Sequence, residues 1–236
     1  MSHDRGARLV ARAGRAAAAL TVMAAWGAVA ALPVAAQHLP PPRAWRWTLD
    51  APARLTDRPL DPAASDTLWR FIAVPTGWQI TTGPGVLLYP AEQPSDTNYV
   101  VETEITVLPG SSDDELGLFV AGTAANGDST YTAFLVRPDG AFAVVRRTDT
   151  TSTYLVPWSR HPAVAARVSE NRLVRQLMRL RVTRSTLALA VNGVEIATLP
   201  RGSLSASGRV GLRLGGDLDV RVSSLKLTYQ FAPSSR

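Results

Sequence analysis

Two glutamates on one predicted strand, Glu102 and Glu104, have the spacing that comes nearest to an acid–base pair. Side chains at positions i and i+2 of a strand point to the same face, with Cα atoms roughly 6.5–7 Å apart. Glycoside hydrolases use two carboxyl groups at comparable separations, one as the acid and one as the nucleophile or base. The alternative is a solvated strand face on which these carboxylates pair with arginines of neighbouring strands. The candidate partners are Arg146, Arg147, Arg179 and Arg181.

Aromatic side chains are a second source of chemistry, because a ring can stack on the apolar face of a sugar and exclude water from it. Trp158, in the segment PWSRHP, is expected to lie exposed in a loop. Together with Trp158, the residues Tyr131, Arg147 and His161 are the candidate ligand contacts. Each ring also has a structural interpretation as core or rim packing, and His161 has one as a turn residue.

Three acidic turns offer oxygen atoms to calcium, but none has the spacing of a known calcium loop. They are Asp113-Asp114-Glu115, Asn126-Gly127-Asp128 and Asp217-Leu218-Asp219. The chain has no cysteine, which excludes a disulfide framework and a thiolate metal site. Zinc hydrolase motifs and the Gly-x-Ser-x-Gly nucleophile elbow are also absent. We therefore expect hydrophilic turns, with no metal and no cofactor.

Short runs rich in β-branched and aromatic residues, separated by turn residues, follow one another from Trp69 onward. Most alternate between apolar and polar positions, as half-buried strands do. Strands are predicted near 69–74, 78–82, 86–89, 98–108, 116–122, 130–137, 141–148, 153–156, 174–183, 186–191, 194–199, 208–214 and 218–230. Asn192-Gly193 predicts a type I′ hairpin, and only residues 161–172 are compatible with a helical turn. The pattern predicts an all-β domain, an antiparallel β-sandwich, over residues 67–232.

The chain before these strands divides into two segments. Residues 1–37 combine arginines, an apolar stretch and small residues up to Ala36, which predicts a signal peptide and export to the periplasm or the extracellular space. An uncleaved membrane anchor is the alternative. Residues 38–66 are rich in proline and aspartate without periodicity, so we expect a linker or irregular edge segment. Within it, Trp45 and Trp47 form either a peripheral strand or exposed rings that touch a ligand.

Charge does not indicate a nucleic-acid partner. The formal net charge is +6, but four of the 25 basic residues and one of the 19 acidic residues lie in residues 1–37, so the remainder carries only +3. That charge is small and scattered along the chain, unlike the basic patch of a nucleic-acid-binding domain. After cleavage of the leader we expect no membrane contact either. The sequence does not indicate an oligomeric state.

Five stretches carry a resemblance to a known group of proteins: NYVVETEITV (98–107), LGLFVAG (116–122), YTAFLVRPDG (131–140), LRVTRSTLALAVNGVEIATL (180–199) and GRVGLRLGGDLDVRVSSLKL (208–227). Their order resembles the concanavalin A-like lectin and glucanase superfamily, including its laminin G-like members and the 3-keto-disaccharide hydrolase-type domains of bacterial exported proteins. The resemblance implies a jelly roll of two curved sheets, with ligands on the concave face or at loops along one edge. The glucanase branch carries Glu-x-Asp-x-x-Glu, whereas here Glu104 replaces the aspartate and Val107 the last glutamate.

These observations predict a secreted, non-catalytic sandwich that binds a carbohydrate or a cell-surface polymer. A glycoside hydrolase-like enzyme that uses Glu102 and Glu104 is the alternative. A second alternative is a structural or partner-binding envelope protein. In that case we expect the concave face to be filled by side chains or covered by residues 38–66.

Overall fold

The computed structural model describes residues 45–50, 58–59, 69–91, 94, 98–125, 128–149, 151–202, 204–205 and 207–230. The predicted signal peptide lies outside these ranges, and so do Asn126 and Gly127 of the second acidic turn. Within the ranges, no helix has the length and apolar character needed to cross a membrane.

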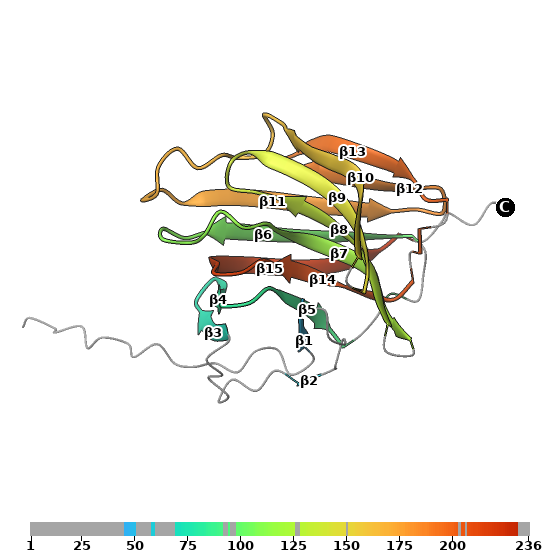
Figure 1. Cartoon of the computed structure of the whole chain (residues 1–236), viewed down its shortest axis with the longest axis horizontal. Helices are drawn as coiled ribbons and strands as arrows, with labels where there is room; N and C mark the ends of the chain where they lie inside the picture. Colours follow the sequence, from blue (N-terminus) through green and yellow to red (C-terminus); the bar gives the residue numbers. More distant parts are fainter. Residues whose placement is uncertain are drawn as a thin grey trace, which may run out of the picture. The chain divides into compact units, whose positions relative to one another are not determined.

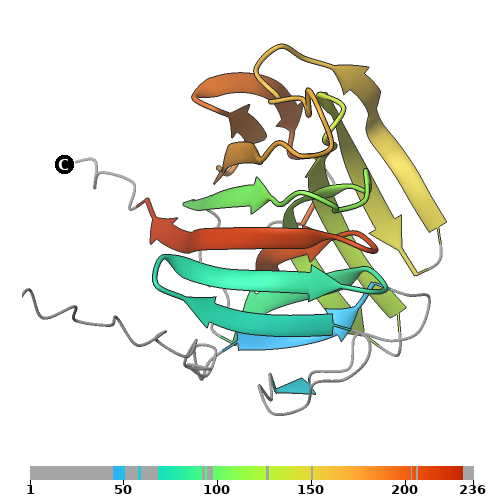
Figure 2. The same cartoon turned by 90° about the vertical axis from the view of Figure 1, so that its left-hand side faces the viewer.

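Two antiparallel sheets form the described part of the protein (Figures 1 and 2). The first, sheet A, has the strand order β10-β9-β8-β7-β14-β5-β1-β2. Its strands are β1 (Trp45–Leu49), β2 (Arg58–Pro59), β5 (Val86–Pro90), β7 (Leu116–Ala125), β8 (Asp128–Val136), β9 (Ala141–Thr148), β10 (Thr151–Arg160) and β14 (Arg209–Leu214). The second, sheet B, has the order β13-β12-β11-β6-β15-β4-β3. Its strands are β3 (Trp69–Val74), β4 (Gly77–Thr82), β6 (Tyr99–Val107), β11 (Val174–Val182), β12 (Thr186–Val191), β13 (Val194–Pro200) and β15 (Asp219–Tyr229).

The strand pattern of the sequence is confirmed from β3 to β15, and the predicted antiparallel sandwich with it. The hairpin between β12 and β13 turns at Asn192 and Gly193, whose φ angles of 50° and 86° are those of the expected type I′ turn. The segment 161–172 contains turns and no helix. One of those turns is closed by the Val164 N–H, which donates to the carbonyl of His161 at 3.0 Å.

The strand β10 is longer than predicted, because it continues through Pro157 to Arg160. Proline removes a backbone donor, which an edge strand tolerates on its unpaired side. The strand β10 is such an edge, and its register against β9 shifts on both sides of Val156. Trp158 therefore lies in a strand rather than in the predicted loop.

The strand β1 lies inside the segment 38–66. Trp45 and Trp47 are both 7% exposed and pack into the core. The sequence WRWTL alternates, so its tryptophans face the opposite sheet while Arg46 and Thr48 point the other way. Of the two interpretations of these tryptophans, the structure supports the peripheral strand.

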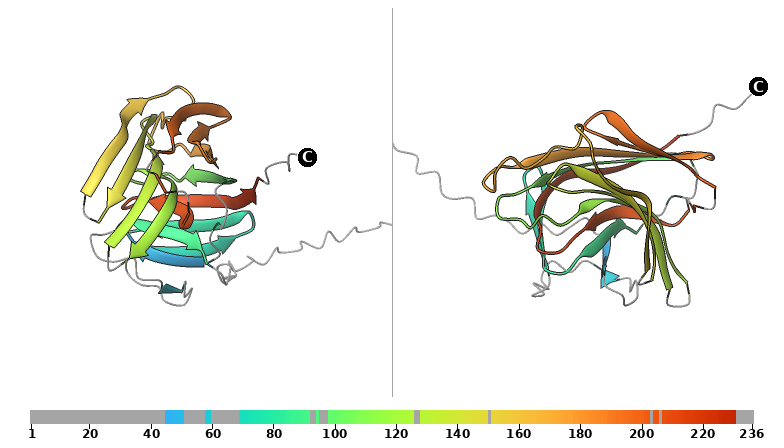
Figure 3. Two further views of the ribbon diagram at one scale, coloured as in Figure 1. Left: turned by 90° about the vertical axis from the view of Figure 1, so that its right-hand side faces the viewer. Right: turned by 45° about the horizontal axis from the view of Figure 1, so that its top comes forward.

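The main core fills the space between the two sheets, which face each other in Figure 3. Strands of both sheets contribute alternate residues to it. In β9, for example, Phe142 and Val144 belong to this core, whereas Ala143 and Val145 point to the opposite side of sheet A. Fully burying one large apolar side chain stabilises a fold by about 1.5–3 kcal/mol. This interior therefore supplies stability that a chain without disulfides needs.

A second apolar cluster covers the other side of sheet A, here called the outer face of sheet A. Its buried members are Leu87, Tyr89, Phe119, Tyr131, Ala133, Leu135, Ala143 and Val145, and Trp158 packs against them. The ring of Phe119 lies 6.1 Å from that of Tyr89 and 5.7 Å from that of Tyr131, both edge-on. Antiparallel sheets commonly face water on one side. Sheet A departs from that pattern, because much of its outer face is apolar and buried. The polar cluster described next lies on the same face.

Candidate functional site

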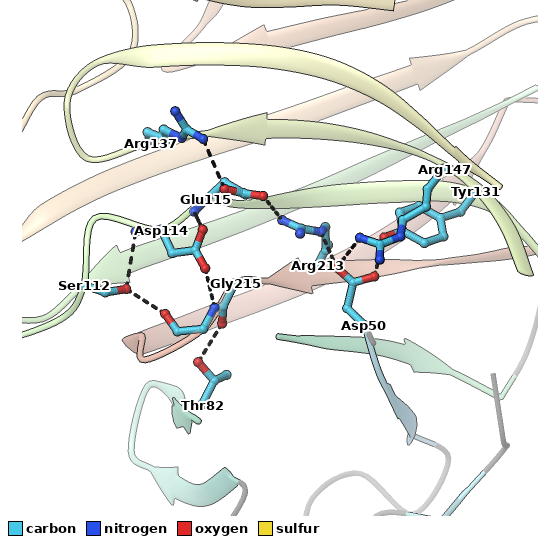
Figure 4. A network of polar contacts seen from close by, with 11 residues as sticks. Asp50, Thr82, Ser112, Asp114, Glu115, Tyr131, Arg137, Arg147, Arg213 and Gly215 are labelled. Carbon is cyan, nitrogen blue, oxygen red and sulfur yellow. Dashed lines mark hydrogen bonds and ion pairs between the residues drawn. The ribbon is translucent and has the colours of Figure 1, made fainter. Parts of the chain in front are cut away.

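A buried arginine, Arg213, forms the centre of a polar cluster on the outer face of sheet A (Figure 4). In β14, Leu212 and Leu214 face the core, so the side chain between them points outward. Its Nε donates to Oδ2 of Asp50 at 2.7 Å, and its Nη1 lies 3.0 Å from Oε1 of Glu115. A buried guanidinium is tolerated when carboxylates compensate its charge. Arg213 thus connects the end of β1 with the start of β7.

Tyr131 and Arg147 join this cluster from β8 and β9, where they are direct cross-strand neighbours. The Tyr131 hydroxyl donates to Oδ1 of Asp50 at 2.5 Å. Nη1 of Arg147 lies 3.7 Å from Oδ2 of Asp50, and its Nε donates to the carbonyl of Asp149 at 3.2 Å. Burial, together with the charge of Asp50, raises the pKa of Tyr131. The phenol therefore stays protonated and acts as a donor.

Two adjacent carboxyl groups, Asp114 and Glu115, lie beside Arg213 and have opposite pKa shifts. Burial and the neighbouring Asp114 raise the pKa of Glu115, although Arg213 and Arg137 act in the opposite direction. Burial also opposes ionisation of Asp114, but hydrogen bonds outweigh it and lower the pKa of this residue. The Glu115 and Gly216 amides donate to Asp114 at 2.8 and 2.6 Å. Asp114 is therefore the ionised member and Glu115 the member held closer to neutrality.

A cavity of about 50 Å³ opens beside this cluster. It is lined by Glu115, Tyr131, Ala133, Leu135, Val145, Arg147, Ser152, Tyr154, Trp158 and Arg213. The guanidinium carbon of Arg137 lies 3.8 Å from the centre of the Trp158 ring, in a cation–π contact. Nε1 of Trp158 is shielded from solvent without an acceptor among the described residues. Tyr154, 51% exposed, completes an aromatic rim.

Three of the four predicted ligand contacts, Tyr131, Arg147 and Trp158, line this one cavity. The fourth, His161, does not: its ring lies 6.1 Å from that of Phe142, and its Nδ1 accepts the Ala163 N–H at 3.1 Å. These contacts support the alternative interpretation, in which His161 is a turn residue. Trp158 is half-buried rather than exposed, because it packs against the second apolar cluster and Arg137 lies over its ring.

Sequence patterns do not single out Asp50, Arg213 or Arg137 as members of the site. The alternation GLRL does indicate that Arg213 points away from the core. Its partner Asp50 is 163 residues away in the sequence and follows a segment without periodicity. No local signal connects residues that far apart.

The glutamates Glu102 and Glu104 lie elsewhere, on the solvent side of sheet B. Glu104 accepts a hydrogen bond from Arg175 at 2.6 Å, and Glu102 lies 3.3 Å from Nε of Arg179. The bond from Arg175 lowers the pKa of Glu104, whereas a general acid needs a raised pKa. These contacts support the alternative interpretation, in which Glu102 and Glu104 form ion pairs on a solvated strand face.

Of the predicted arginine partners of these glutamates, only Arg179 is confirmed. Arg146 and Arg147 lie in sheet A, and Arg181 pairs with Glu195 at 3.2 Å. The register of β6 against β11 explains the difference, because it sets Arg179 opposite Glu102 and Arg175 on the diagonal from Glu104.

In the first and third acidic turns, carboxylate oxygens bond within the fold. Asp113 pairs with Arg167 at 3.0 Å, and Asp219 accepts from Nε2 of Gln79 at 3.0 Å. Among the described residues, no three histidine or acidic side chains are grouped so that they could hold a metal ion.

No family model and no curated protein matches the chain. Solved structures do match. A carbohydrate binding module, CBM66, from Bacillus subtilis superposes with a TM-score of 0.53 and 9% identity, over 68% of this chain and 94% of that one. The chain has the concanavalin A-like fold.

Further solved structures that match this concanavalin A-like sandwich are more distant in shape. A protein with a galectin-like fold from Bacillus subtilis matches with a TM-score of 0.49 and 13% identity, over 78% of this chain and 98% of its own. An alginate lyase from Corynebacterium sp. matches with a TM-score of 0.46 and 12% identity, over 80% and 95% of the two chains. The two antiparallel sheets and the match to the carbohydrate binding module confirm the predicted jelly-roll class.

Proposed function

We propose that this concanavalin A-like sandwich is an exported, non-catalytic module that binds a carbohydrate on the outer face of sheet A. The observation that carries the proposal is the convergence of Tyr131, Arg147, Tyr154 and Trp158 on one cavity. Aromatic rings beside a few fixed polar groups are the usual composition of small-ligand sites. The superposition on a protein named a carbohydrate binding module supports the same function.

The polar groups of the site are held in place before any ligand arrives. Asp50 accepts the Tyr131 hydroxyl on one oxygen and Nε of Arg213 on the other, so neither side chain needs to rearrange. A contact that is already ordered loses less conformational entropy when a ligand binds. This buried network therefore favours a binding role for the outer face of sheet A.

The size of the cavity limits how a sugar can bind. Pockets that enclose a drug-sized ligand have volumes of about 300–1,000 Å³, whereas this cavity has about 50 Å³. A sugar ring must therefore lie over the rim, where Tyr154 is exposed, while a substituent enters the cavity. Such a shallow arrangement suits one unit of a polymer better than a free, fully enclosed sugar.

One observation favours a second function, the partner-binding sandwich. Leu87, Tyr89 and Phe119 lie on the outer face of sheet A but are each only about 1% exposed. These side chains are therefore inaccessible to a small ligand. A sandwich that binds no small ligand is expected to have such a covered face. The experiment below separates the two functions.

A polysaccharide pull-down combined with a thermal-shift screen tests the proposal. A ligand at one hundred times its dissociation constant stabilises the folded state by about 2.7 kcal/mol, which raises the melting temperature. We expect Trp158→Ala to abolish retention and shift for any sugar that the native chain binds. Tyr229→Ala removes an exposed ring from sheet B and is the matched control, expected to bind normally. Absence of any shift over a broad panel would support the partner-binding sandwich instead.

A further inference from the structure

Two of the side chains that line the cavity, Trp158 and Arg147, carry N–H groups without an acceptor among the described residues. The indole N–H of Trp158 is shielded from solvent and has no acceptor among the described residues. A buried donor without an acceptor is unfavourable and points to a missing ligand or water. The terminal amino groups of Arg147 make no hydrogen bond to a described residue, since its 3.7 Å approach to Asp50 exceeds hydrogen-bond length. The cavity thus offers two sets of N–H groups.

The carboxylate oxygens nearby already face N–H or O–H groups of the protein. The two oxygens of Asp50 receive Tyr131 and Arg213. The two oxygens of Asp114 receive the amides of Glu115 and Gly216. Glu115 lies 3.0 Å from Arg213 and 3.5 Å from Arg137. Among the charged groups and the Trp158 indole, the unused capacity is therefore on the donor side, which favours a ligand group that accepts.

The charges that line the cavity also favour a ligand group that accepts hydrogen bonds, because positive groups predominate. Arg147 and Arg213 face a single acidic lining residue, Glu115. Burial raises the pKa of that residue, which weakens its negative charge. A third guanidinium, that of Arg137, lies on the Trp158 ring at 3.8 Å. Asp50 and Asp114 contribute negative charge behind the lining, but both are bonded as described above.

We propose that the cavity binds the carboxylate of an acidic sugar unit, which accepts hydrogen bonds from Arg147 and from the Trp158 indole. This inference rests on the proposed carbohydrate-binding function and names its ligand class. A carboxylate is planar and matches the two parallel N–H groups of a guanidinium. It is also a group small enough for about 50 Å³, with the sugar ring outside against Tyr154.

Calorimetric titration with pairs of ligands that differ only in charge tests the inference. The probes are carboxylated oligosaccharides, beginning with oligogalacturonate, each compared with its neutral methyl ester. One hydrogen bond to a charged group corresponds to about a ten- to hundredfold change in affinity. We expect the acids to bind at least about tenfold tighter than the esters, and added salt to reduce that preference.

Two substitutions of Arg147 test whether this residue causes the preference for the acid over the ester. Arg147→Gln is expected to remove the difference between acid and ester, whereas Arg147→Lys retains part of it because the charge remains. Arg179→Gln is the matched control, since Arg179 is also paired with one carboxylate but lies on sheet B. Melting curves of all three variants verify that they are folded.

The possible results separate this inference from the proposed function. If acids and esters bind equally and both need Trp158, the acidic-sugar inference is wrong and the carbohydrate-binding function remains. If no ligand of the panel binds through Trp158, both are wrong. An acid preference that Arg147→Gln leaves intact would also overturn the inference, because the charge would then be recognised elsewhere.

Discussion

Both sheets carry pairs of arginine and acidic side chains outside the core, but the pairs differ in how far they are exposed to solvent. On sheet B, Arg181 and Glu195 are about half exposed, and Arg179 and Glu102 are similar. On sheet A, the side chains of Arg213 and Asp50 are only 10% and 4% exposed. Water screens the first set, so its pairs contribute little to stability. The second set is shielded, and its Asp50 also accepts a hydrogen bond from the Tyr131 hydroxyl. We therefore expect the pairs on sheet A to contribute more to stability than those on sheet B, and the binding role that we propose depends on the same shielding.

The largest effect is expected at Asp50. Asp50→Asn removes the carboxylate that balances Arg213 and leaves a shielded guanidinium with one acidic partner. Breaking a buried pair in this way costs about 3–5 kcal/mol, to be measured by urea unfolding. The control on sheet B is Glu102→Gln, for which we expect a loss of about 1 kcal/mol or less. Equal losses in the two variants would contradict the difference between the sheets.

A smaller effect is expected when one hydrogen bond of the buried network is removed. Tyr131→Phe deletes the hydroxyl that donates to Asp50. A hydrogen bond to a charged group contributes about 1.5–3 kcal/mol, and the unfolding free energy should fall by that amount. Tyr154→Phe alters an exposed ring at the same site and should change stability very little. A loss as large in Tyr154→Phe would show that the network is not the cause.

The pH dependence of stability provides a third comparison. The pKa of Glu115 is raised above its ordinary value of 4.5 in the folded state, so the folded state favours the protonated form. Its contribution to stability is therefore complete at low pH and is lost as the pH rises from the ordinary value through the raised one. Glu115→Gln lacks this group, so its stability relative to the native chain should increase with pH. Unfolding of both proteins at a series of pH values measures this, and a decrease would contradict the assigned environment.

The smallest effect is expected for a pair on sheet B. A double-mutant cycle with Arg181→Gln and Glu195→Gln should give a coupling energy of about 0.2–1 kcal/mol. Salt should reduce it further, because the pair is exposed. A coupling as large as that of the buried cluster would mean that exposure does not distinguish the two sheets.

Alternation along the chain is sufficient to predict the strands from β3 to β15, because each strand buries one side against the other sheet. It does not predict β2, which lies in the segment without periodicity. Tyr131 and Arg147 both occupy outward positions of predicted strands, and their role as ligand contacts stays a prediction. Alternation did not predict that β10 continues through Pro157, because proline ordinarily argues against a strand and only an edge position tolerates it. Trp158 was consequently assigned to an exposed loop.

The partners within the site could not be predicted, for a physical reason. The contact between Asp50 and Arg213 depends on how β1 and β14 are brought together in one sheet by chain segments far apart in the sequence. The pairing of Glu104 with Arg175 likewise depends on the register of β6 and β11. A shift of one residue reverses the face of every side chain in a strand. Such choices become visible only in the folded arrangement.

Hydrogen–deuterium exchange of the full chain, with and without the oligosaccharide that raises the melting temperature most, tests the central claim most directly. We predict that bound ligand slows exchange in β8, β9 and β10, which carry Tyr131, Arg147 and Trp158, and leaves β6 and β11 unchanged. Protection confined to β6 and β11 would place the ligand on sheet B at Glu102 and Glu104, and would contradict the account.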